Sequence, residues 1–157
     1  MGLVVTGVVA GVMGTLAMDS LNYLVARTGV LAKIDVRMIG RMAAGWARGR
    51  FRYQRPGEIA QTANETLHGY LSHYAIGVSL ALVYVFGWEL LIGGPASPIW
   101  AVAYGVATTA AAYFFILPSM GLGVCGRLSP EGVKVPLSSL ANHLFYGVGL
   151  AVGVAVM

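Results

Sequence analysis

The sequence predicts an all-α membrane protein, a four-transmembrane-helix bundle with an amphipathic interfacial helix in its first cytoplasmic loop. Three observations predict this fold. The chain has four apolar stretches of about 20 residues, the length that crosses a roughly 30 Å hydrocarbon core. It is 57% hydrophobic and only 10% charged, whereas soluble domains carry about a quarter charged residues. Finally, all of its Lys and Arg residues fall in two of the connecting loops.

The four apolar stretches cover residues 3–25, 71–92, 98–120 and 137–157. A tight turn around Gly93, Gly94 and Pro95 joins the second to the third, and a Gly- and Pro-rich loop joins the third to the fourth. With 157 residues and a mean hydropathy of +0.74, we expect a single membrane domain over residues 1–157. Its longest loop is the basic cytoplasmic segment 26–70.

The distribution of basic residues predicts the orientation. Of the ten Lys and Arg residues, Arg127 and Lys134 lie in the third loop and all the others in the first. Cytoplasmic loops carry the excess of positive charge, so both loops should face the cytoplasm. Trp88 and Trp100 flank the uncharged turn and would anchor it at the outer interface. We therefore expect a multi-pass membrane protein with both termini on the outer side.

The first loop should contain helical structure. Asp35 can cap a helix over residues 36–47, whose apolar side chains gather on one side, as is typical of an interfacial helix. These side chains are Met38, Ile39, Met42 and Trp46. The run from Glu58 to Tyr70 is expected to extend the second spanning helix into the cytoplasm.

Glycines recur at the spacing that lets two helices approach closely. Gly7 and Gly11 are four apart in the first span, as are Gly149 and Gly153 in the fourth. Such small residues favour helix packing inside membranes. Packing within the chain is the preferred interpretation, and a dimer interface is the alternative. We expect a homo-oligomer.

Ionisable groups inside a membrane are costly and indicate a functional site. Asp19, His73 and His143 lie on three different spans, all within roughly 10 Å of the cytoplasmic boundary at a rise of about 1.5 Å per residue. A bundle would bring them together if they face inward. Supporting polar residues are Asn22, Glu65, Tyr74 and Asn142.

Several chemistries fit this set. Two imidazoles and a carboxylate suit a transition metal, which is the one cofactor that these residues suggest. They also suit a proton relay, since His titrates near neutral pH. A Ser-His-Asp hydrolase is a third option, although no G-x-S-x-G motif is present. The same groups can also pair with neighbouring Asn and Tyr side chains simply to hold the helices together.

Basic and aromatic residues alternate after the predicted loop helix. Arg41 and Arg50 are candidates to hold an anionic headgroup or the acidic end of a substrate, because Arg forks match phosphate geometry. With the membrane close by, anionic lipids are the expected partners, and nucleic acid is not.

A break is expected at the end of the third span. Pro118 should kink or end that helix, and Gly121 and Gly123 follow at once. A broken helix at a membrane boundary can line a cavity.

Several segments resemble a bacterial membrane family known as "domain of unknown function 2938". These segments are GTLAMD (14–19), IGRMAAGWARGRF (39–51), HYAIG (73–77), LPSMGLG (117–123) and NHLFYGVGL (142–150). The resemblance covers nearly the whole chain. It implies the same topology and the same choice of Asp19, His73 and His143, and it implies no activity. Because the family is bacterial, the resemblance also implies an inner (plasma) membrane protein with both termini periplasmic. Leu117 stands where a Gln often precedes the proline, and Tyr70 where a Trp is common.

These observations lead to one functional hypothesis with two rivals. A polar Asp/His/His site near the cytoplasmic face binds or transports a small ligand, metal ion or proton. The first rival is an intramembrane enzyme acting on a lipid or quinone-like substrate, with a histidine as general base. The second is a structural or accessory membrane subunit. Whether the protein is an enzyme stays open.

Overall fold

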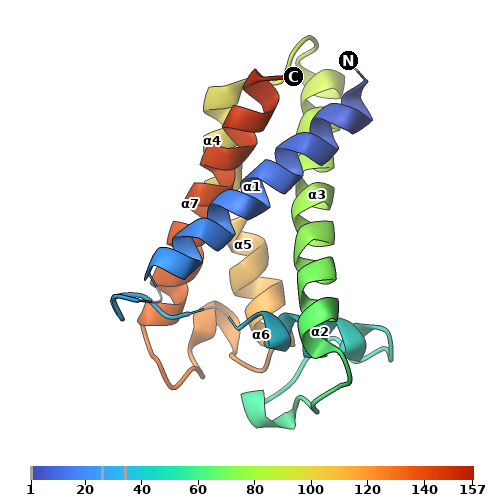
Figure 1. The fold of residues 1–157 in the computed structure, drawn as a ribbon. Coiled ribbons are helices and arrows are strands. Elements are labelled where there is room, and N and C mark those ends of the chain that lie inside the picture. Colours follow the sequence, from blue (N-terminus) through green and yellow to red (C-terminus); the bar gives the residue numbers. More distant parts are fainter. Residues whose placement is uncertain (1, 26, 34) are drawn as a thin grey trace. The chain divides into compact units, whose positions relative to one another are not determined.

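The computed structural model describes residues 2–25, 27–33 and 35–157, and every regular element among them is a helix (Figure 1). Residue 26, with which the predicted first loop begins, lies outside this part. Four of the helical segments are long and apolar enough to cross a membrane. The prediction of an all-α chain with four candidate spans is confirmed in these terms.

The first two spans are single helices. α1 (Leu3–Val25) has the predicted bounds, and α3 (Glu65–Leu91) begins six residues before the predicted apolar span. The prediction that the helix extends back to Glu58 is wrong. Pro56 opens a short 3₁₀ turn, η1 (Pro56–Glu58), and Asn64 has a left-handed φ of 55°. That conformation interrupts a right-handed helix, so α3 starts at the next residue.

The third span changes character along its length. It begins as α4 (Pro98–Ala107), continues as α5 (Thr109–Ala111), widens into the π-helix η2 (Ala112–Ile116) and ends in α6 (Leu117–Ser119). Pro118 has no N–H to offer the carbonyl four residues earlier, and its ring would clash with that carbonyl. A wider turn just before the proline relieves this clash. The predicted break at Pro118 is therefore present.

α7 (Lys134–Ala155) forms the fourth span. It starts three residues earlier than predicted, with Pro136 in its first turn, where a missing N–H does no harm. Between α6 and α7 lies the loop that contains the short 3₁₀ turn η3 (Val124–Gly126).

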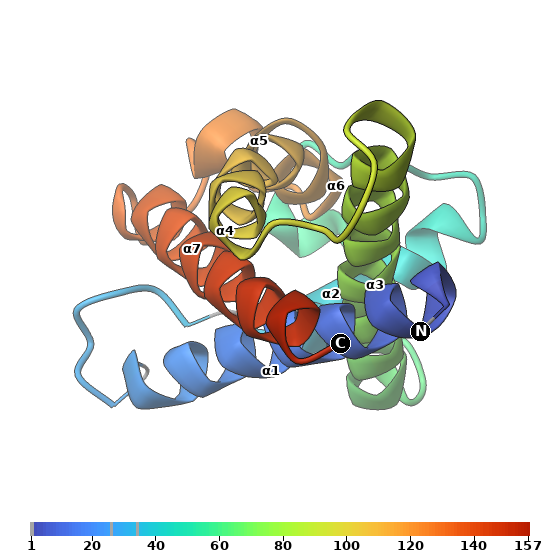
Figure 2. The ribbon, with the colours of Figure 1, turned by 90° about the horizontal axis from the view of Figure 1, so that it is seen from above.

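The chain divides into two compact units, which we describe separately. Unit 1 comprises Met1–Leu24, Tyr74–Thr108 and Leu140–Met157. Here α1 runs across both α3 and α7, as Figure 2 shows from above. Glycines bring the helices together: a methyl group built on Gly11 would lie 2.6 Å from Val78 Cα of α3, and one on Gly153 would lie 2.4 Å from Ala10 Cα of α1.

Unit 2 comprises Val25–His73 and Thr109–Ser139. It contains α2 (Val36–Trp46), whose N-cap Asp35 accepts a hydrogen bond from the backbone N–H of Arg37. The predicted helix and cap are therefore present. The buried residues of α2 include Ile39 and Met42. Gly40 faces the backbone of Glu65, so this side of α2 packs against the first turn of α3.

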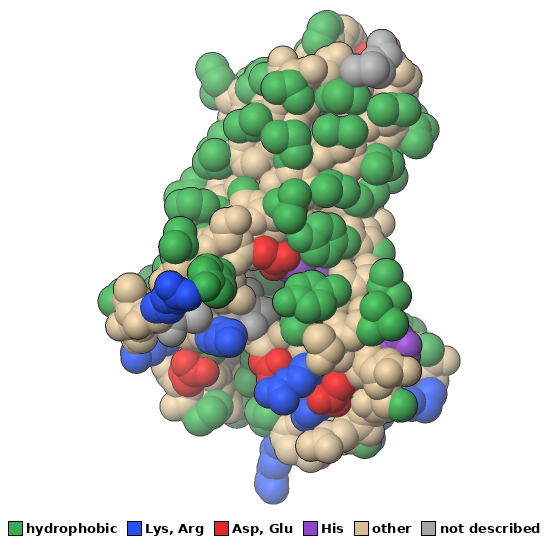
Figure 3. All heavy atoms as spheres, in the orientation of Figure 1, with side chains coloured by type: hydrophobic (Ala, Val, Ile, Leu, Met, Phe, Trp, Pro, Cys, Tyr) green, Lys and Arg blue, Asp and Glu red, His purple; other side chains and the backbone are tan. Residues whose placement is uncertain are grey.

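The basic residues are confined to one of the two units. Every Lys and Arg of the sequence lies in the ranges of unit 2, and unit 1 has Asp19 and Glu89 as its charged side chains. On the face shown in Figure 3, the visible Lys and Arg side chains lie over segments of unit 2. Hydrophobic side chains cover much of the rest of this face. Exposed hydrophobic residues of unit 1 include Val4, Leu16 and Val83.

Candidate functional site

Asp19 of α1 is hydrogen-bonded to Tyr74 of α3. The Tyr74 hydroxyl donates to Asp19 Oδ2 over 3.0 Å, and both side chains are partly buried in unit 1. A carboxylate in an apolar helix needs such a donor, because an unsatisfied charge there is costly. Tyr74 therefore serves as the first polar partner of the predicted site residue Asp19.

The seam between α1 and α3 positions this pair. Gly11, Thr15 and Asp19 follow one another at intervals of four, so they lie on one face of α1. Methyl groups built on Gly11 and on Gly77 would meet the opposite helix at Val78 Cα (2.6 Å) and Thr15 Oγ1 (2.0 Å). One turn beyond Thr15 on α1 is Asp19, and one turn before Gly77 on α3 is Tyr74, so these two side chains meet. Close helix approach at the glycines thus makes the hydrogen bond possible.

His143 of α7 is held by Thr108 at the end of α4. Thr108 Oγ1 lies 2.8 Å from His143 Nδ1 and 2.5 Å from the carbonyl oxygen of Gly105. Thr108 is 7% exposed. A hydroxyl has one proton, and the Thr108 proton goes to the Gly105 carbonyl. The Thr108 oxygen can therefore accept from His143 Nδ1–H, in the tautomer that carries the proton on Nδ1.

Glycines also position this second pair. A methyl group on Gly105 would lie 2.3 Å from Gly147 Cα, so α4 and α7 are in direct backbone contact. Gly147 is one turn beyond His143 on the same face of α7, and Gly105 is close to one turn before Thr108 on α4. The two facing glycines therefore fix the distance over which Thr108 and His143 meet.

Tyr146 connects α7 to the α1–α3 seam. Its side chain is 2% exposed, and its hydroxyl donates to the carbonyl oxygen of Gly77 over 2.6 Å. A methyl group on Gly14 of α1 would lie 2.8 Å from the Tyr146 ring. Three helices thus meet around one buried tyrosine in unit 1.

The remaining predicted site residues lie on both units. Asn22 is half-buried on α1, and Asn142 is 3% exposed on α7. His73 is half-buried on α3 and belongs to unit 2, so its membership in one site with Asp19 and His143 stays a prediction. Over residues 2–25, 27–33 and 35–157, no group of three or more His, Cys, Asp or Glu side chains is arranged to hold a metal ion.

Glu65 has a partner in unit 2. Arg41 Nε and Nη2 donate to the two Glu65 carboxylate oxygens over 2.7 and 2.9 Å. Both side chains are largely buried, at 16% and 17% exposure. The hydrogen bonds from Arg41 to Glu65 raise the pKa of the Arg41 guanidinium. The fork joins the middle of α2 to the start of α3.

Arg50 also has an acidic partner within the chain. Its guanidinium lies 3.2 Å from Glu58 Oε2 and stacks 4.2 Å above the centre of the Tyr53 ring. Arg41 and Arg50 are thus both engaged inside unit 2, and their role toward an anionic headgroup stays a prediction.

The segment after the third span is buried against the first loop. The Pro118 carbonyl accepts from the Tyr53 N–H over 3.3 Å, and Ser119 donates to the Phe51 carbonyl over 2.7 Å. Gly121, with a φ of 76°, lies where a methyl group would be 2.5 Å from the Arg55 carbonyl carbon. Gly123 is likewise buried, with a φ of 74°. These residues make a tight packing contact within unit 2.

The contacts described above involve the sequence segments that carry the family resemblance. A comparison with protein families confirms that resemblance. The model of the family described as "protein of unknown function (DUF2938)" matches residues 8–157. The chain belongs to this family. No curated protein and no solved structure matches the chain.

In this DUF2938 chain the family-like segments contribute to both units. The Gly-Arg segment of α2, the Phe51 region and the Pro118–Gly123 segment converge in unit 2. The segments around Asp19 and His143 supply the polar pairs of unit 1.

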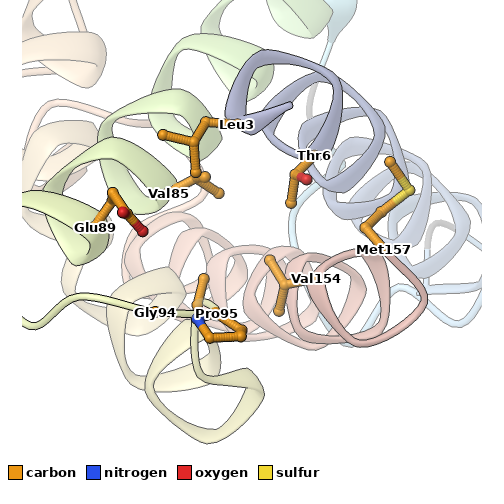
Figure 4. Close-up of a pocket in the computed structure, with 9 residues that line it drawn as sticks. Leu3, Thr6, Val85, Glu89, Gly94, Pro95, Val154 and Met157 are labelled. Atoms are coloured by element: carbon orange, nitrogen blue, oxygen red, sulfur yellow. The ribbon is translucent and has the colours of Figure 1, made fainter. Parts of the chain in front are cut away.

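Two residues of unit 1 were missed by the sequence reasoning. Thr108 was not among the predicted site residues, although a hydroxyl within a span is a candidate partner for a histidine. Glu89 stands in the predicted second span, and an intramembrane carboxylate is itself a functional signal. Glu89 lines a cavity of about 330 Å³. Figure 4 shows Glu89 together with Val85 and Val154, which also line it.

Proposed function

We propose that this DUF2938 protein is a four-helix inner-membrane bundle that binds or moves a proton or small ligand at a polar site near the cytoplasmic face. Asp19 and His143 are its ionisable groups, and Tyr74 and Thr108 orient them. The observation that carries the proposal is the Tyr74–Asp19 hydrogen bond at 3.0 Å between two helices apolar enough to cross a membrane. Polar groups kept in such a place usually mark an ion or substrate path.

The His143 geometry supports proton exchange. In the tautomer whose Nδ1–H donates to Thr108, His143 takes up or releases its proton at Nε2. Histidine is the side chain whose ordinary pKa lies within the physiological range. Asp19, held as a hydrogen-bond acceptor by Tyr74, supplies a negative charge in a unit without Lys or Arg. These are the components that a proton relay or a small-cation site needs.

The membrane arrangement in this proposal follows the charge distribution. Unit 2, with every basic residue, lies at the cytoplasmic side, where anionic lipids attract Lys and Arg. Because α2 packs its buried side on α3, only its exposed side and the flanking Phe51 are available to the lipid interface.

Proton flux into vesicles tests the proposal. The purified chain is reconstituted into vesicles that hold a pH-sensitive dye, and a potassium gradient with valinomycin sets an inside-negative potential. We expect faster acidification than in protein-free vesicles. Asp19→Asn and His143→Gln should abolish the difference, while His68→Gln, a change at an exposed histidine of unit 2, should leave it intact.

A second measurement separates a functional site from helix packing alone. Tyr74→Phe removes one interhelical hydrogen bond, worth about 1 kcal/mol or less in a membrane, so the fold survives. If the pair only holds helices together, Tyr74→Phe lowers thermal stability slightly and changes neither proton flux nor any small molecule retained in native mass spectrometry. Loss of flux or of a retained molecule at near-parental stability supports the proposal. Parental vesicles that acidify no faster than empty ones, with no molecule retained, contradict it.

A further inference from the structure

A second candidate site lies in unit 1, formed by residues other than the polar pairs. The cavity of about 330 Å³ is bordered by α1, α3, α7 and the turn that precedes α4. Figure 4 shows the Glu89 carboxylate extending from α3 on the cavity side. Apolar side chains make most of the wall, namely Leu3, Val85, Pro95, Ala96, Val154 and Met157. Small-molecule sites typically have volumes of about 300–1,000 Å³ with mostly apolar walls and few polar groups.

Glu89 has no Lys or Arg in its own unit to balance its charge, and the unit's histidine, His143, contacts Thr108 and is not among the cavity-lining residues. Unit 1 contains no Lys and no Arg, and its other acid, Asp19, already accepts from Tyr74. A carboxylate on the wall of a cavity attracts a positive charge, and Glu89 is an exposed residue whose carboxylate an incoming cation can reach. The occupant that matches Glu89 is therefore a cation.

The wall chemistry decides which kind of cation fits. Calcium and magnesium ions require six or more oxygen ligands, whereas this wall offers the Glu89 carboxylate and the Thr6 hydroxyl as its polar side chains. An organic ammonium group needs one carboxylate, and an apolar body attached to it would contact Val85 and Val154. The cavity suits a small ammonium ion with an apolar body better than an inorganic ion.

We propose that this cavity binds a small organic cation, with Glu89 receiving the ammonium group and the walls from α1, α3 and α7 holding its apolar part. The site does not depend on the polar pairs at Asp19 and His143. Either proposal can fail without affecting the other.

Calorimetric titration with benzyltrimethylammonium tests the site. The full chain in a neutral maltoside detergent should bind this probe saturably, and tetramethylammonium, which lacks the apolar ring, more weakly. Glu89→Gln keeps the shape and removes the charge, so binding of the ring-bearing probe should weaken about tenfold, equivalent to about 1.4 kcal/mol. Glu131→Gln, at an exposed acid of unit 2, is the matched control and should leave the affinity unchanged.

Filling the cavity provides an independent check. Val154→Phe adds volume inside the wall and should also weaken binding, without altering the Glu89 carboxylate. Ala96→Leu serves the same purpose from the turn if Val154→Phe does not fold. Equal affinities in the parent and Glu89→Gln, unchanged binding in the folded filling variant, or no saturable binding by the parent would each overturn the proposal.

Discussion

The polar side chains of unit 1 show how single polar residues are accommodated in helices apolar enough to cross a membrane. Tyr74 donates to Asp19, and Thr108 accepts from His143 while donating to the Gly105 carbonyl. In each pair one partner carries the ionisable group and the other fixes its direction. Tyr146 adds a third such contact, to the Gly77 carbonyl. Asp19 and His143 are therefore each oriented by the hydroxyl group of a neighbouring helix.

The Thr108 contact predicts a defined tautomer for His143. In ¹⁵N spectra of histidine-labelled protein above the histidine pKa, we expect His143 to carry its proton on Nδ1. Thr108→Val removes the acceptor, so the proton should move toward Nε2, because the hydrogen bond sets which nitrogen is protonated. Thr108→Ser keeps the hydroxyl and should keep the parental signal. Identical His143 spectra for the Val variant and the parent would show that Thr108 does not select the tautomer.

The sequence revealed the ionisable members of these pairs better than their partners. Asp19 and His143 stand out because charge in an apolar span is rare, and Tyr74 was included because it adjoins His73. Thr108 was not identified, because an uncharged threonine among alanines has no unusual energetic cost in an apolar helix. Whether Asp19 meets Tyr74 depends on helix rotation, which is set by contacts such as that of Gly11 with Val78. A single sequence does not specify that rotation.

At the scale of helices, glycine contacts determine the packing of unit 1. Gly7 and Gly11 face α3, and Gly149 and Gly153 face α1. The spacing predicted either packing within the chain or a dimer interface, and these glycines are occupied by contacts within the chain. They therefore no longer support a dimer, and oligomerisation remains an expectation without a surface assigned to it.

The close packing of α1 against α3 predicts how substitutions of its glycines change the stability of the protein. The methyl group of Gly11→Ala would lie 2.6 Å from Val78 Cα, so the helices must move apart, at a cost of about 1–3 kcal/mol. The Asp19–Tyr74 hydrogen bond should weaken as well. Gly87→Ala, in the same pair of helices but with nothing within 4 Å, should instead stabilise the protein by about 0.5–1 kcal/mol. Thermal unfolding in detergent, followed by circular dichroism, compares the two variants.

Equal melting temperatures for Gly11→Ala and Gly87→Ala would contradict the close approach of α1 and α3. A loss confined to Gly11→Ala would confirm it.

Element boundaries followed the apolar runs closely and the loops less well. α1 and the start of α4 were predicted to the residue, because charge or Gly and Pro residues bound those runs. The predicted start of α3 was wrong. Residues 58–64 contain no Gly or Pro that would mark a helix boundary, and the left-handed φ of Asn64 is one of several backbone conformations that an asparagine can adopt. Pro118 was a reliable signal, but the π-helix that precedes it could not be foreseen from sequence.

At the scale of the whole molecule, the division of charge is the leading feature. Unit 2 carries all ten Lys and Arg residues with four of the six acids, and unit 1 carries the other two. The formal charges are therefore +6 and −2, which sum to the +4 of the chain. Such an imbalance is typical of proteins oriented by positive residues at the cytoplasmic face.

Cysteine labelling checks the orientation. In a Cys125→Ser background, which has no other cysteine, Ser97→Cys marks the uncharged turn and Gln54→Cys marks the basic first loop. A membrane-impermeant maleimide added to spheroplasts should label Ser97→Cys and not Gln54→Cys. After lysis both should react. The reverse pattern in intact spheroplasts would show that the basic loop faces outward.

The turn between α3 and α4 has a consequence for how the protein enters the bilayer. Tyr84 donates to the Ser97 carbonyl, and Tyr104 donates to the Leu80 carbonyl, so these two helices are held as a hairpin. The tip, residues 92–97, carries no charged side chain. During insertion the translocation machinery would have only Glu89, near the end of α3, to move through hydrocarbon as a charge.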